Sequence, residues 1–336
     1  MSFQPLFSHI YVEEQAQDYP LCKKILGRFP KATCVGIQSY KEVFNRPRQR
    51  WDHQQHTLKL ILAVRDDAFL YPGSSFVPNF QHTRFFYTTP ALNCLYGCEY
   101  CYLQGMFPSA NVVVFVNSSD FTDTASQQLQ GPDPAYLCIS YDTDLLAFED
   151  ILGYCSVWTE FARNNPHVTL EIRTKSAHSR FFREVTPVPN VIIAWTLSPE
   201  QIIATYEHKT PRLASRLAAM RVAQECGWKV RICYDPVLPV SGWRSAYAGL
   251  VETTFASVDP KTVHDISIGV FRIPSGYLRV MQESNPGSKL LHHPFTIRNG
   301  SASHSPEEYT EVIDHVSQQL AQHVSQEKIC PVPWQS

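Results

Sequence analysis

Hydrophobic and polar residues follow two different periods along the chain, and the changes between the two periods mark the predicted elements. From Arg84 onward, short apolar runs of strand length alternate with longer stretches in which apolar residues recur at helical spacing. The predicted strands are 84–88, 112–116, 136–140, 169–174, 191–197, 229–234 and 265–271. The predicted helices between them are 120–130, 148–163, 211–226 and 243–255.

Strands that alternate with helices in this way are typical of parallel βαβ units. Six or seven consecutive units predict an α/β protein, built as an open, partial (β/α)6-type TIM barrel. We expect this barrel to occupy residues 81–290.

Shorter patterns flank the predicted barrel on both sides. Residues 9–12 form an apolar run, 14–29 read as helical, and 57–64 alternate like a strand, so residues 1–80 predict a small N-terminal α/β extension. The turn-forming stretch Tyr71-Pro72-Gly73-Ser74-Ser75 places a boundary near residue 80. Residues 291–336 predict an amphipathic helix at 306–324 and a tail that pack on the barrel.

Composition limits the class of protein. The 336 residues are 44% hydrophobic and 18% charged, which is typical of a globular protein with a large core. The net charge of −2 means that any nucleic-acid surface must be a local patch. No secretory n-region or membrane-spanning apolar stretch is present, so we expect no membrane partner. Ten cysteines in a chain of this length are not a disulfide framework, which favours a reducing, cytoplasmic location.

Three cysteines, Cys94, Cys98 and Cys101, stand in the order CxxxCxxC. A [4Fe-4S] cluster is usually held by four cysteine thiolates. A loop that supplies only three leaves one iron free to chelate S-adenosylmethionine (SAM). This arrangement is typical of the radical SAM superfamily, in which electron transfer from the cluster cleaves SAM to a 5′-deoxyadenosyl radical and the protein positions the cofactor.

Half of a structural zinc site is the first alternative for the same cysteines. The sequence holds no second CxxC and no HxxxH pair, and His53 and His56 lie far upstream. The aromatic Tyr100 directly before the third cysteine also favours the cluster. Zinc ligands and ordinary buried thiols remain the two alternatives.

Polar residues follow the predicted strands at their carboxyl ends, which is where the site of such a barrel lies. Each of these residues, taken alone, could instead be a helix cap or a solvated loop residue. Lys175 is the strongest candidate, because a cation suits the carboxylate of a bound cofactor. The full set comprises Tyr141, Asp142, Thr143, Asp144, Lys175, Thr196, Ser198 and Asp235.

Two basic segments are candidates for contact with nucleic acid. Arg46, Arg48 and Arg50 surround a proline and precede Trp51, so they combine phosphate-binding groups with an aromatic ring for base stacking. Arg272 and Arg279 flank a predicted turn beyond the barrel. A solvated loop is the alternative interpretation of the first segment.

Around the cysteine loop the sequence resembles the spore photoproduct lyase family. The resembling segments are Ile10-Tyr11-Val12-Glu13, Asp18-Tyr19-Pro20-Leu21, Cys98-Glu99-Tyr100-Cys101-Tyr102-Leu103-Gln104, Arg173-Thr174-Lys175 and residues 272–290. The resemblance implies a radical SAM carbon-carbon lyase that reverses a UV-induced thymine photoproduct in DNA (spore photoproduct, 5-thyminyl-5,6-dihydrothymine). It implies a [4Fe-4S] cluster, SAM, a lesion swung out of the duplex, and an electron donor such as flavodoxin or ferredoxin.

The resemblance also implies residue roles. Tyr100 and Tyr102 match the tyrosines that help to return a hydrogen atom, and Thr143, Lys175 and either Thr196 or Ser198 match cofactor contacts. Cys94, Cys98 and Cys101 match the cluster ligands. The DNA contacts expected for such an enzyme are Arg46, Arg48, Arg50, Arg272 and Arg279.

One position departs from the family pattern. The family's hydrogen-donating cysteine falls on Tyr141, and the nearest thiol, Cys138, is three residues earlier and points to the opposite face of a regular strand. Either Tyr141 supplies the hydrogen, with Cys138 as a core thiol or a substitute donor, or the substrate is another pyrimidine photoproduct, an RNA or a small molecule. A nucleic-acid-binding protein with a structural metal is the alternative outside enzymes.

Overall fold

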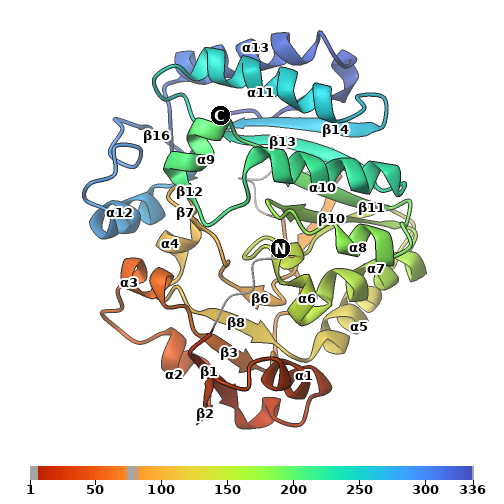
Figure 1. The fold of residues 1–336 in the computed structure, drawn as a ribbon, viewed down its shortest axis with the longest axis vertical. Coiled ribbons are helices and arrows are strands. Elements are labelled where there is room, and N and C mark those ends of the chain that lie inside the picture. The colour runs from red at the N-terminus through yellow and green to blue at the C-terminus, as the bar shows by residue number, and fades with distance from the viewer. Residues whose placement is uncertain (1–6, 74–79, 81, 335–336) are drawn as a thin grey trace.

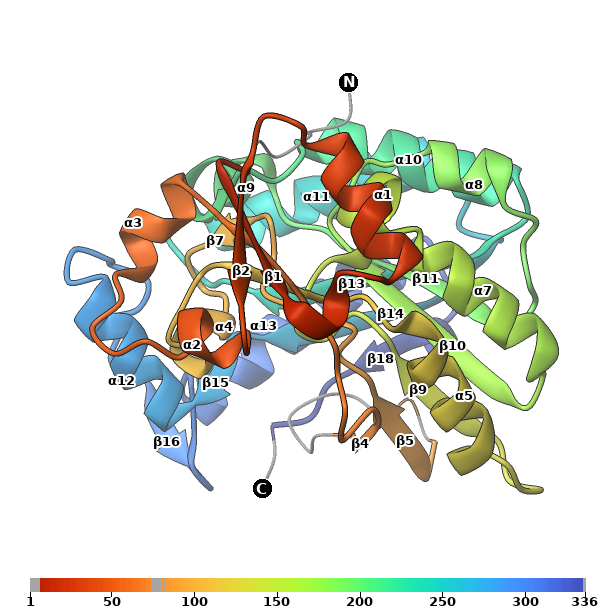
Figure 2. The ribbon, with the colours of Figure 1, turned by 90° about the horizontal axis from the view of Figure 1, so that it is seen from below.

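The computed structural model describes residues 7–73, 80 and 82–334. Two sheets organise these residues (Figures 1 and 2). The smaller sheet lies at one end of the molecule, and the larger sheet carries most of the helices on its outer face. No helix of the described residues is both long and apolar enough to cross a membrane.

The smaller sheet has five strands in the order β2-β1-β3-β8-β6. Its strands are β1 (His9–Glu13), β2 (Thr33–Ile37), β3 (Leu60–Ala63), β6 (Ala91–Leu92) and β8 (Val112–Phe115). The first four in the order run parallel, and β6 is antiparallel to β8. Its helical elements are η1 (Glu14–Ala16), α1 (Pro20–Arg28), α2 (Lys41–Phe44), α3 (Trp51–His56) and α5 (Ser118–Gln128).

The position of β8 corrects one expectation. Residues 112–116 form a strand as predicted, but the strand pairs with β3, in the register Leu60 to Val112, and not with the barrel. All four residues of β8 are buried, and an apolar run of this kind does not reveal which sheet it joins. The smaller sheet therefore extends beyond the boundary expected near residue 80. Within the turn predicted there, Tyr71 and Pro72 form β4, and Ser74 and Ser75 lie outside the described residues.

The larger sheet confirms the prediction of an α/β fold with an open, partial barrel. Its order is β18-β14-β13-β11-β10-β9-β5-β4, and within the described residues its two edge strands do not pair with each other. All neighbours run parallel except β4 and β5. The strands are β4 (Tyr71–Pro72), β5 (Arg84–Tyr87), β9 (Ala135–Cys138), β10 (Val168–Thr174), β11 (Val191–Thr196), β13 (Lys229–Val237), β14 (Val263–Val270) and β18 (Ile329–Pro331).

The crossover helices lie between these strands in sequence. They are η2 (Leu145–Phe148), α6 (Glu149–Leu152), α7 (Tyr154–Asn164), α8 (Arg180–Glu184), α9 (Glu200–Tyr206), α10 (Leu213–Glu225) and α11 (Trp243–Ser257). The helix predicted over 148–163 is interrupted at Gly153, whose φ of 72° is a left-handed conformation that glycine adopts without strain. The Glu149 carboxylate then accepts hydrogen bonds from the backbone N–H groups of Cys155 and Ser156, which stabilises the start of α7.

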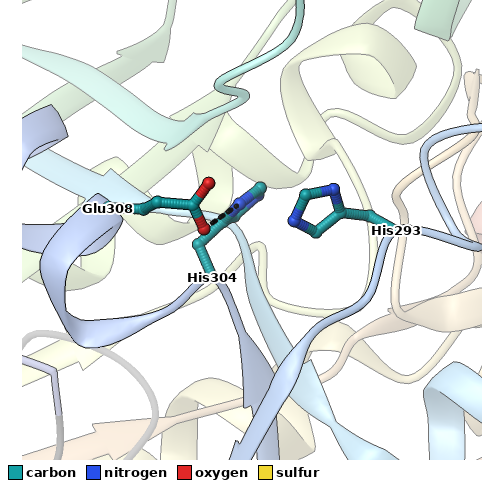
Figure 3. A group of neighbouring side chains, drawn as sticks. All are labelled: His293, His304 and Glu308. Atoms are coloured by element: carbon teal, nitrogen blue, oxygen red, sulfur yellow. Dashed lines mark ion pairs between the residues drawn. The ribbon is translucent and has the colours of Figure 1, made fainter.

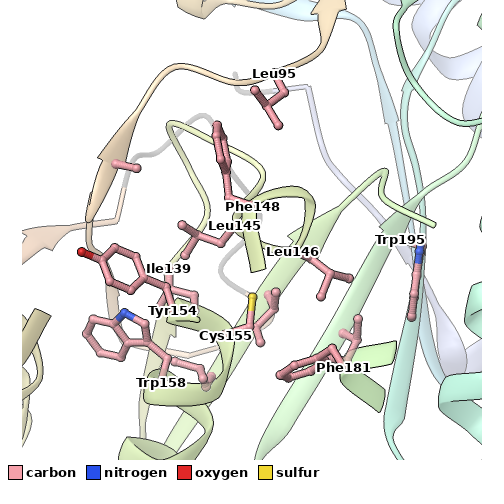
Figure 4. Close-up of a cluster of buried hydrophobic side chains, with 14 of the residues drawn as sticks. Leu95, Ile139, Leu145, Leu146, Phe148, Tyr154, Cys155, Trp158, Phe181 and Trp195 are labelled. Carbon is pink, nitrogen blue, oxygen red and sulfur yellow. The ribbon is translucent and has the colours of Figure 1, made fainter. Parts of the chain in front are cut away.

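The core beneath these helices also anchors the cysteine loop (Figure 4). Leu145, Leu146 and Phe148 of η2 lie among the side chains of α7 and the sheet, and Leu95 of the cysteine loop belongs to the same cluster with 1% of its surface exposed. Burial of a leucine side chain contributes about 1.5–3 kcal/mol. The loop is thereby tied to the barrel core one residue after its first cysteine.

The segment after β14 contains more structure than predicted. It forms β15 (Arg272–Pro274), α12 (Ser275–Ser284), β16 (Thr296–Arg298), β17 (Ser301–Ser303), α13 (Pro306–Leu320), η3 (Gln326–Lys328) and β18. Strands β15, β17 and β16 make a small antiparallel sheet. The C-terminal helix was predicted, but the tail also adds β18 as a parallel edge strand next to β14.

Candidate active site

A cavity of about 480 Å³ opens at the carboxyl ends of the barrel strands, where the sequence placed the site. Its lining includes the cysteine loop, the polar ends of β9, β10, β11 and β13, and residues of α4 (Leu103–Met106), β15 and α12. Cys94, Cys98 and Cys101 all line this one cavity.

The start of the cysteine loop is fixed by Asn93. This residue has a φ of 68°, a left-handed conformation that asparagine tolerates better than most residues. Its buried side-chain amide donates hydrogen bonds to the carbonyl oxygens of Ser109 and Asn111, at 2.7 and 2.8 Å. The turn that presents Cys94 is therefore held by the segment just before β8.

The rest of the loop is held by two further parts of the chain. The two-residue strand β7 (Gly97–Cys98) pairs with β12 (Glu207–His208), and the Glu99 N–H donates to the Tyr206 carbonyl at 2.7 Å. The Gln104 side chain donates to the Cys98 carbonyl at 2.8 Å and accepts a hydrogen bond from Asn285 at 3.2 Å. These contacts hold the loop in place.

The thiols occupy an environment that disfavours isolated thiolates. Burial raises the pKa of Cys94 and Cys101, and raises the pKa of Cys98 to about 12. Thiolates here need a nearby positive charge, which the iron ions of a cluster provide. Three cysteines of one loop that line one cavity fit the thiolate ligands of a [4Fe-4S] cluster.

Lys175 lies beside these cysteines at the end of β10. Burial acts to lower its pKa, but the nearby Cys98 and Glu207 outweigh burial and hold it above the ordinary value. Its ammonium group lies 5.5 Å from the centre of the Tyr100 ring. A charged lysine at this position provides a partner for an anionic group of a ligand.

The hydroxyl of Tyr100 is held by a buried carboxylate that the sequence did not reveal. Glu207 accepts hydrogen bonds from Tyr100 and from Ser198, the latter at 2.7 Å, and pairs with Arg216, whose side chain is fully buried. Ser198, predicted as a cofactor contact, directs its hydroxyl to Glu207. The sequence around Glu207 does not predict that its carboxylate is buried, because this burial depends on Arg216, which pairs with it from helix α10.

Tyr102 and Tyr141 meet in the lining of the cavity. The Tyr102 hydroxyl donates to the Tyr141 carbonyl at 2.6 Å and lies 3.1 Å from the Asp142 carboxylate. The Tyr141 ring lies 4.8 Å from the Tyr87 ring, centre to centre. Among the described residues, neither the Tyr141 hydroxyl nor the Thr143 hydroxyl has a hydrogen-bond partner, although both are buried in the cavity wall.

Asp144 joins the ends of two barrel strands. Its carboxylate accepts hydrogen bonds from the Thr174 hydroxyl at 2.8 Å and the Lys175 N–H at 2.7 Å. Asp144 therefore positions the Lys175 backbone, and its carboxylate is occupied by contacts within the protein. Thr196 lines the cavity from the end of β11.

Cys138 occupies a different place from Tyr141. Its thiol is 3.6 Å from the Glu171 carboxylate in the barrel interior, and the described lining of the cavity does not include it. Burial, and next the nearby Cys138, raise the pKa of Tyr141. Of the two, only Tyr141 belongs to the described lining of the cavity.

The two arginines grouped beyond the barrel are separated by the structure. Arg272 lines the cavity and makes a two-pronged ion pair with Asp235, at 2.8 and 3.2 Å, and its contact with DNA stays a prediction. Gly269 permits this pair, because a Cβ there would lie 2.5 Å from the Asp235 carboxylate. Arg279 is exposed on α12 and pairs with Glu283 at 3.2 Å.

The basic segment near residue 48 is exposed between α2 and α3. Arg46 donates to the Glu42 carbonyl at 2.8 Å, Arg50 pairs with Asp52 at 2.7 Å, and Arg48 is exposed with a φ of 60°. Figures 1 and 2 both place α3 and α12 on the side of the molecule away from α7 and α8. The basic segment and the helix that carries Arg279 therefore lie on the same side of the molecule.

Comparisons with known proteins extend over nearly the whole chain. Residues 3–299 match the family model described as spore photoproduct lyase. The spore photoproduct lyase of Bacillus subtilis is 22% identical over 291 residues, covering 84% of this chain and 83% of that protein. The spore photoproduct lyase of a Geobacillus species is 22% identical over 292 residues, with the same coverage.

Solved structures show the same fold. A spore photoproduct lyase variant with bound AdoMet and dinucleoside spore photoproduct matches with a TM-score of 0.83 and 18% identity, over 100% of both chains. A spore photoproduct lyase complexed with dinucleoside spore photoproduct matches with a TM-score of 0.82 and 18% identity, over 98% of this chain and 99% of that one. Because the family model covers most of the sequence, the chain belongs to the spore photoproduct lyase family.

Proposed function

We propose that this protein is a radical SAM DNA-repair lyase that reverses spore photoproduct. The observation that carries the proposal is the convergence of Cys94, Cys98 and Cys101 with the phenols of Tyr102 and Tyr141 on one cavity of about 480 Å³. Membership of the spore photoproduct lyase family supports the substrate class. Relatives of the same fold have been solved with AdoMet and with the dinucleoside lesion.

The three thiols would hold a [4Fe-4S] cluster, and Lys175, Thr143 and Thr196 would contact SAM. When bound, these cofactors supply the 5′-deoxyadenosyl radical that removes a hydrogen atom from the lesion. Lys175 stays protonated beside Cys98 and Glu207, and so provides a positive charge to a carboxylate. Thr143 offers a buried hydroxyl that has no partner among the described residues.

The residues of this chain would then return a hydrogen to the thymine radical left after the crosslink breaks. We assign this step to the Tyr141 phenol, which is buried in the cavity wall and protonated at neutral pH, because burial and the nearby Cys138 raise its pKa. Donation leaves a phenoxyl radical on Tyr141. Tyr100, held by Glu207, and Tyr102, hydrogen-bonded to the Tyr141 backbone, would pass a hydrogen atom from 5′-deoxyadenosine to this radical, which restores the Tyr141 O–H bond.

A second candidate substrate follows from the same residue. By the sequence resemblance, Tyr141 stands where the family has its donor cysteine, and its ring packs with that of Tyr87 in the cavity wall. A related pyrimidine photoproduct is therefore the alternative. An electron donor such as flavodoxin or ferredoxin and a cytoplasmic location belong to the proposal, because a thiolate-bound cluster requires a reducing compartment.

The substrate class can be tested by following 5′-deoxyadenosine in the anaerobic, cluster-reconstituted protein with dithionite and SAM. We expect irradiated DNA containing spore photoproduct to stimulate its formation above the level with unirradiated DNA, and irradiated RNA to have no effect. A Cys98→Ala variant, which lacks one thiol ligand, is the control and should form none. Equal rates with all three nucleic acids would contradict the proposal.

A further inference from the structure

A second cluster of metal-ligating side chains lies outside the cavity, where the small antiparallel sheet meets α13 (Figure 3). His293 precedes β16, His304 follows β17, and Glu308 lies in the first turn of α13. One ligand atom from each of the three lies within 4.8 Å of the others. The His304 ring lies between the Glu308 carboxylate and the His293 ring.

The surroundings of the His304 ring point to a ligand. Its surface is only 3% exposed, yet among the described residues neither ring nitrogen has a hydrogen-bond partner. The Glu308 carboxylate is 3.7 Å from Nδ1, which is longer than a hydrogen bond. Buried polar groups are normally paired, so two orphaned nitrogens on one buried ring call for an explanation.

The chemistry of the three groups suits a divalent metal ion. A neutral imidazole offers a nitrogen lone pair to a metal ion, and both His304 ring nitrogens are without a hydrogen-bond partner among the described residues. Glu308 contributes a negative charge. Two imidazoles and one carboxylate are a ligand set that zinc accepts in proteins, with a fourth position left for water.

The surrounding contacts hold the ligands in place. The Phe295 ring packs against both imidazoles, at 5.0 Å from His293 and 5.3 Å from His304. The exposed Glu308 side chain completes a capping box at the start of α13: it accepts from the Ser305 N–H, and the Ser305 hydroxyl accepts from the Glu308 N–H, both at 3.2 Å. The second carboxylate oxygen is still available for a metal ion.

We propose that His293, His304 and Glu308 bind one Zn²⁺ ion, separate from the iron–sulfur cluster. Tetrahedral ligation at about 2.0–2.1 Å places ligand atoms roughly 3.4 Å apart, so a shift of about 1 Å in the outer side chains completes the site. His293 is half-buried and Glu308 is exposed, so both can make this shift while His304 stays fixed.

The ion would brace one wall of the active-site cavity. Phe295 also packs against Phe271, at 5.3 Å between ring centres, and Phe271 lines that cavity. The three ligands join the segment before β16, the end of β17 and the start of α13. Zinc would therefore tie the small sheet to the C-terminal helix through three protein ligands, with water in the fourth position.

The test is zinc uptake by the cluster-reconstituted, full-length protein. Wild type is incubated anaerobically with ZnCl₂ and desalted, and zinc and iron per chain are measured by elemental analysis. We expect one zinc per chain with iron content unchanged, and a rise in the unfolding temperature on adding zinc. His293→Gln and Glu308→Gln should weaken zinc binding by at least roughly tenfold.

Two features make these variants informative. Glutamine at position 308 can still complete a capping box, so loss of binding would reflect the carboxylate and not a damaged helix start. His292→Gln is the matched control, since His292 is the exposed neighbour of His293 and lies outside the three-residue set. It should bind zinc like wild type.

A parallel measurement separates this site from the thiols. The Cys94→Ala/Cys98→Ala/Cys101→Ala variant cannot bind zinc through the loop, and it should still take up one zinc per chain. The proposal is overturned if wild type takes up no zinc. It is equally overturned if His293→Gln and Glu308→Gln bind zinc like wild type, or if uptake disappears only in the triple cysteine variant.

Discussion

Tyr141 combines three properties that a hydrogen-atom donor needs. Its hydroxyl is buried, lies in the cavity wall and has no hydrogen-bond partner among the described residues. Its raised pKa, due first to burial and then to Cys138, keeps the O–H bond intact at neutral pH. Cys138, by contrast, points its thiol to Glu171 in the barrel interior.

Replacing Tyr141 with phenylalanine removes the hydroxyl and keeps the ring. We expect this variant to form 5′-deoxyadenosine at the wild-type level in the first turnover, but to recover less thymine and to accumulate by-products, because the product radical is no longer quenched. Tyr87→Phe is the matched control, since its ring packs against that of Tyr141 at 4.8 Å. Undiminished, clean repair by Tyr141→Phe would remove this phenol from the mechanism.

Asp142 makes the stability of the protein pH-dependent in a defined direction. Burial raises its pKa from 3.8 to about 6, despite the hydrogen bond from Tyr102. The folded state therefore holds this proton at pH values where the unfolded state has released it, so stability falls as pH rises from about 4 to about 6. A difference of about two pKa units corresponds to at most about 3 kcal/mol.

Asp142→Asn should remove this contribution. The free energy of unfolding of both proteins is measured by urea denaturation. We expect the variant's value minus the wild-type value to increase as pH rises from about 4 to about 6, and to stay constant above about pH 7. Parallel curves for the two proteins across this range would mean that the Asp142 carboxyl ionises as readily in the folded state as in the unfolded chain.

At the scale of elements, the cysteine loop depends on a close approach of α4 and α12. A Cβ on Gly105 would lie 2.5 Å from the Tyr277 backbone oxygen and Cβ, a distance that real contacts do not show. The absence of a side chain at Gly105 thus lets α12 pack directly against the helix that follows Cys101. Tyr277 of α12 lines the cavity at the same place.

Gly105→Ala should force the two helices apart. We expect a loss of about 1–3 kcal/mol of stability, as for other overpacked sites, together with lower iron content after reconstitution. Gly276→Ala is the matched control in α12, because a Cβ there meets no atom within 4 Å and the residue is exposed. Iron content that is equal in the two variants would mean that this helix contact does not support the loop.

Some elements of the fold could be predicted from the sequence and others could not, for physical reasons. The barrel strands from β9 to β14 were predictable because each is a buried apolar run between helical segments. Strand β8 was assigned to the wrong sheet, since burial on both faces gives no information about the strand's neighbours. The break at Gly153 was missed because a glycine within a helical pattern marks a break only when tertiary contacts use its left-handed conformation.

The candidate site was predictable where residues are close in sequence. Cys94, Cys98 and Cys101 share a loop, and Lys175 follows a strand. Glu207 and the Asp235–Arg272 pair became visible only in the structure, because each depends on a partner far away in the chain. The position of Arg272 in the cavity wall could not be predicted for the same reason: nothing near it in the sequence marks the carboxylate that pairs with it.

At the scale of the whole molecule, the near-zero net charge restricts DNA contact to local patches. The exposed arginines between α2 and α3 and Arg279 of α12 lie on one side of the protein, away from α7 and α8. We propose this side as the DNA-facing surface, with Arg46, Arg48, Arg50 and Arg279 as phosphate contacts. Arg272 would act inside the cavity.

Arg279→Ala should weaken binding to all DNA sequences alike. If Arg279 contacts one phosphate, the slope of the logarithm of affinity against the logarithm of salt concentration falls by about 0.9. Arg221→Ala is the matched control, because Arg221 makes a similar i,i+4 pair, with Glu225 on the distant helix α10. Equal salt slopes for the two variants would place the DNA surface elsewhere.

The central claim is that this cavity repairs spore photoproduct despite a tyrosine at the donor position. It is tested most directly by incubating the reconstituted protein anaerobically with dithionite, SAM and the dinucleoside lesion, and measuring recovered thymidylyl-thymidine. We predict multiple turnovers that yield thymidylyl-thymidine as the main product. Formation of 5′-deoxyadenosine with no recovered thymidylyl-thymidine would contradict the claim and direct the search to another photoproduct.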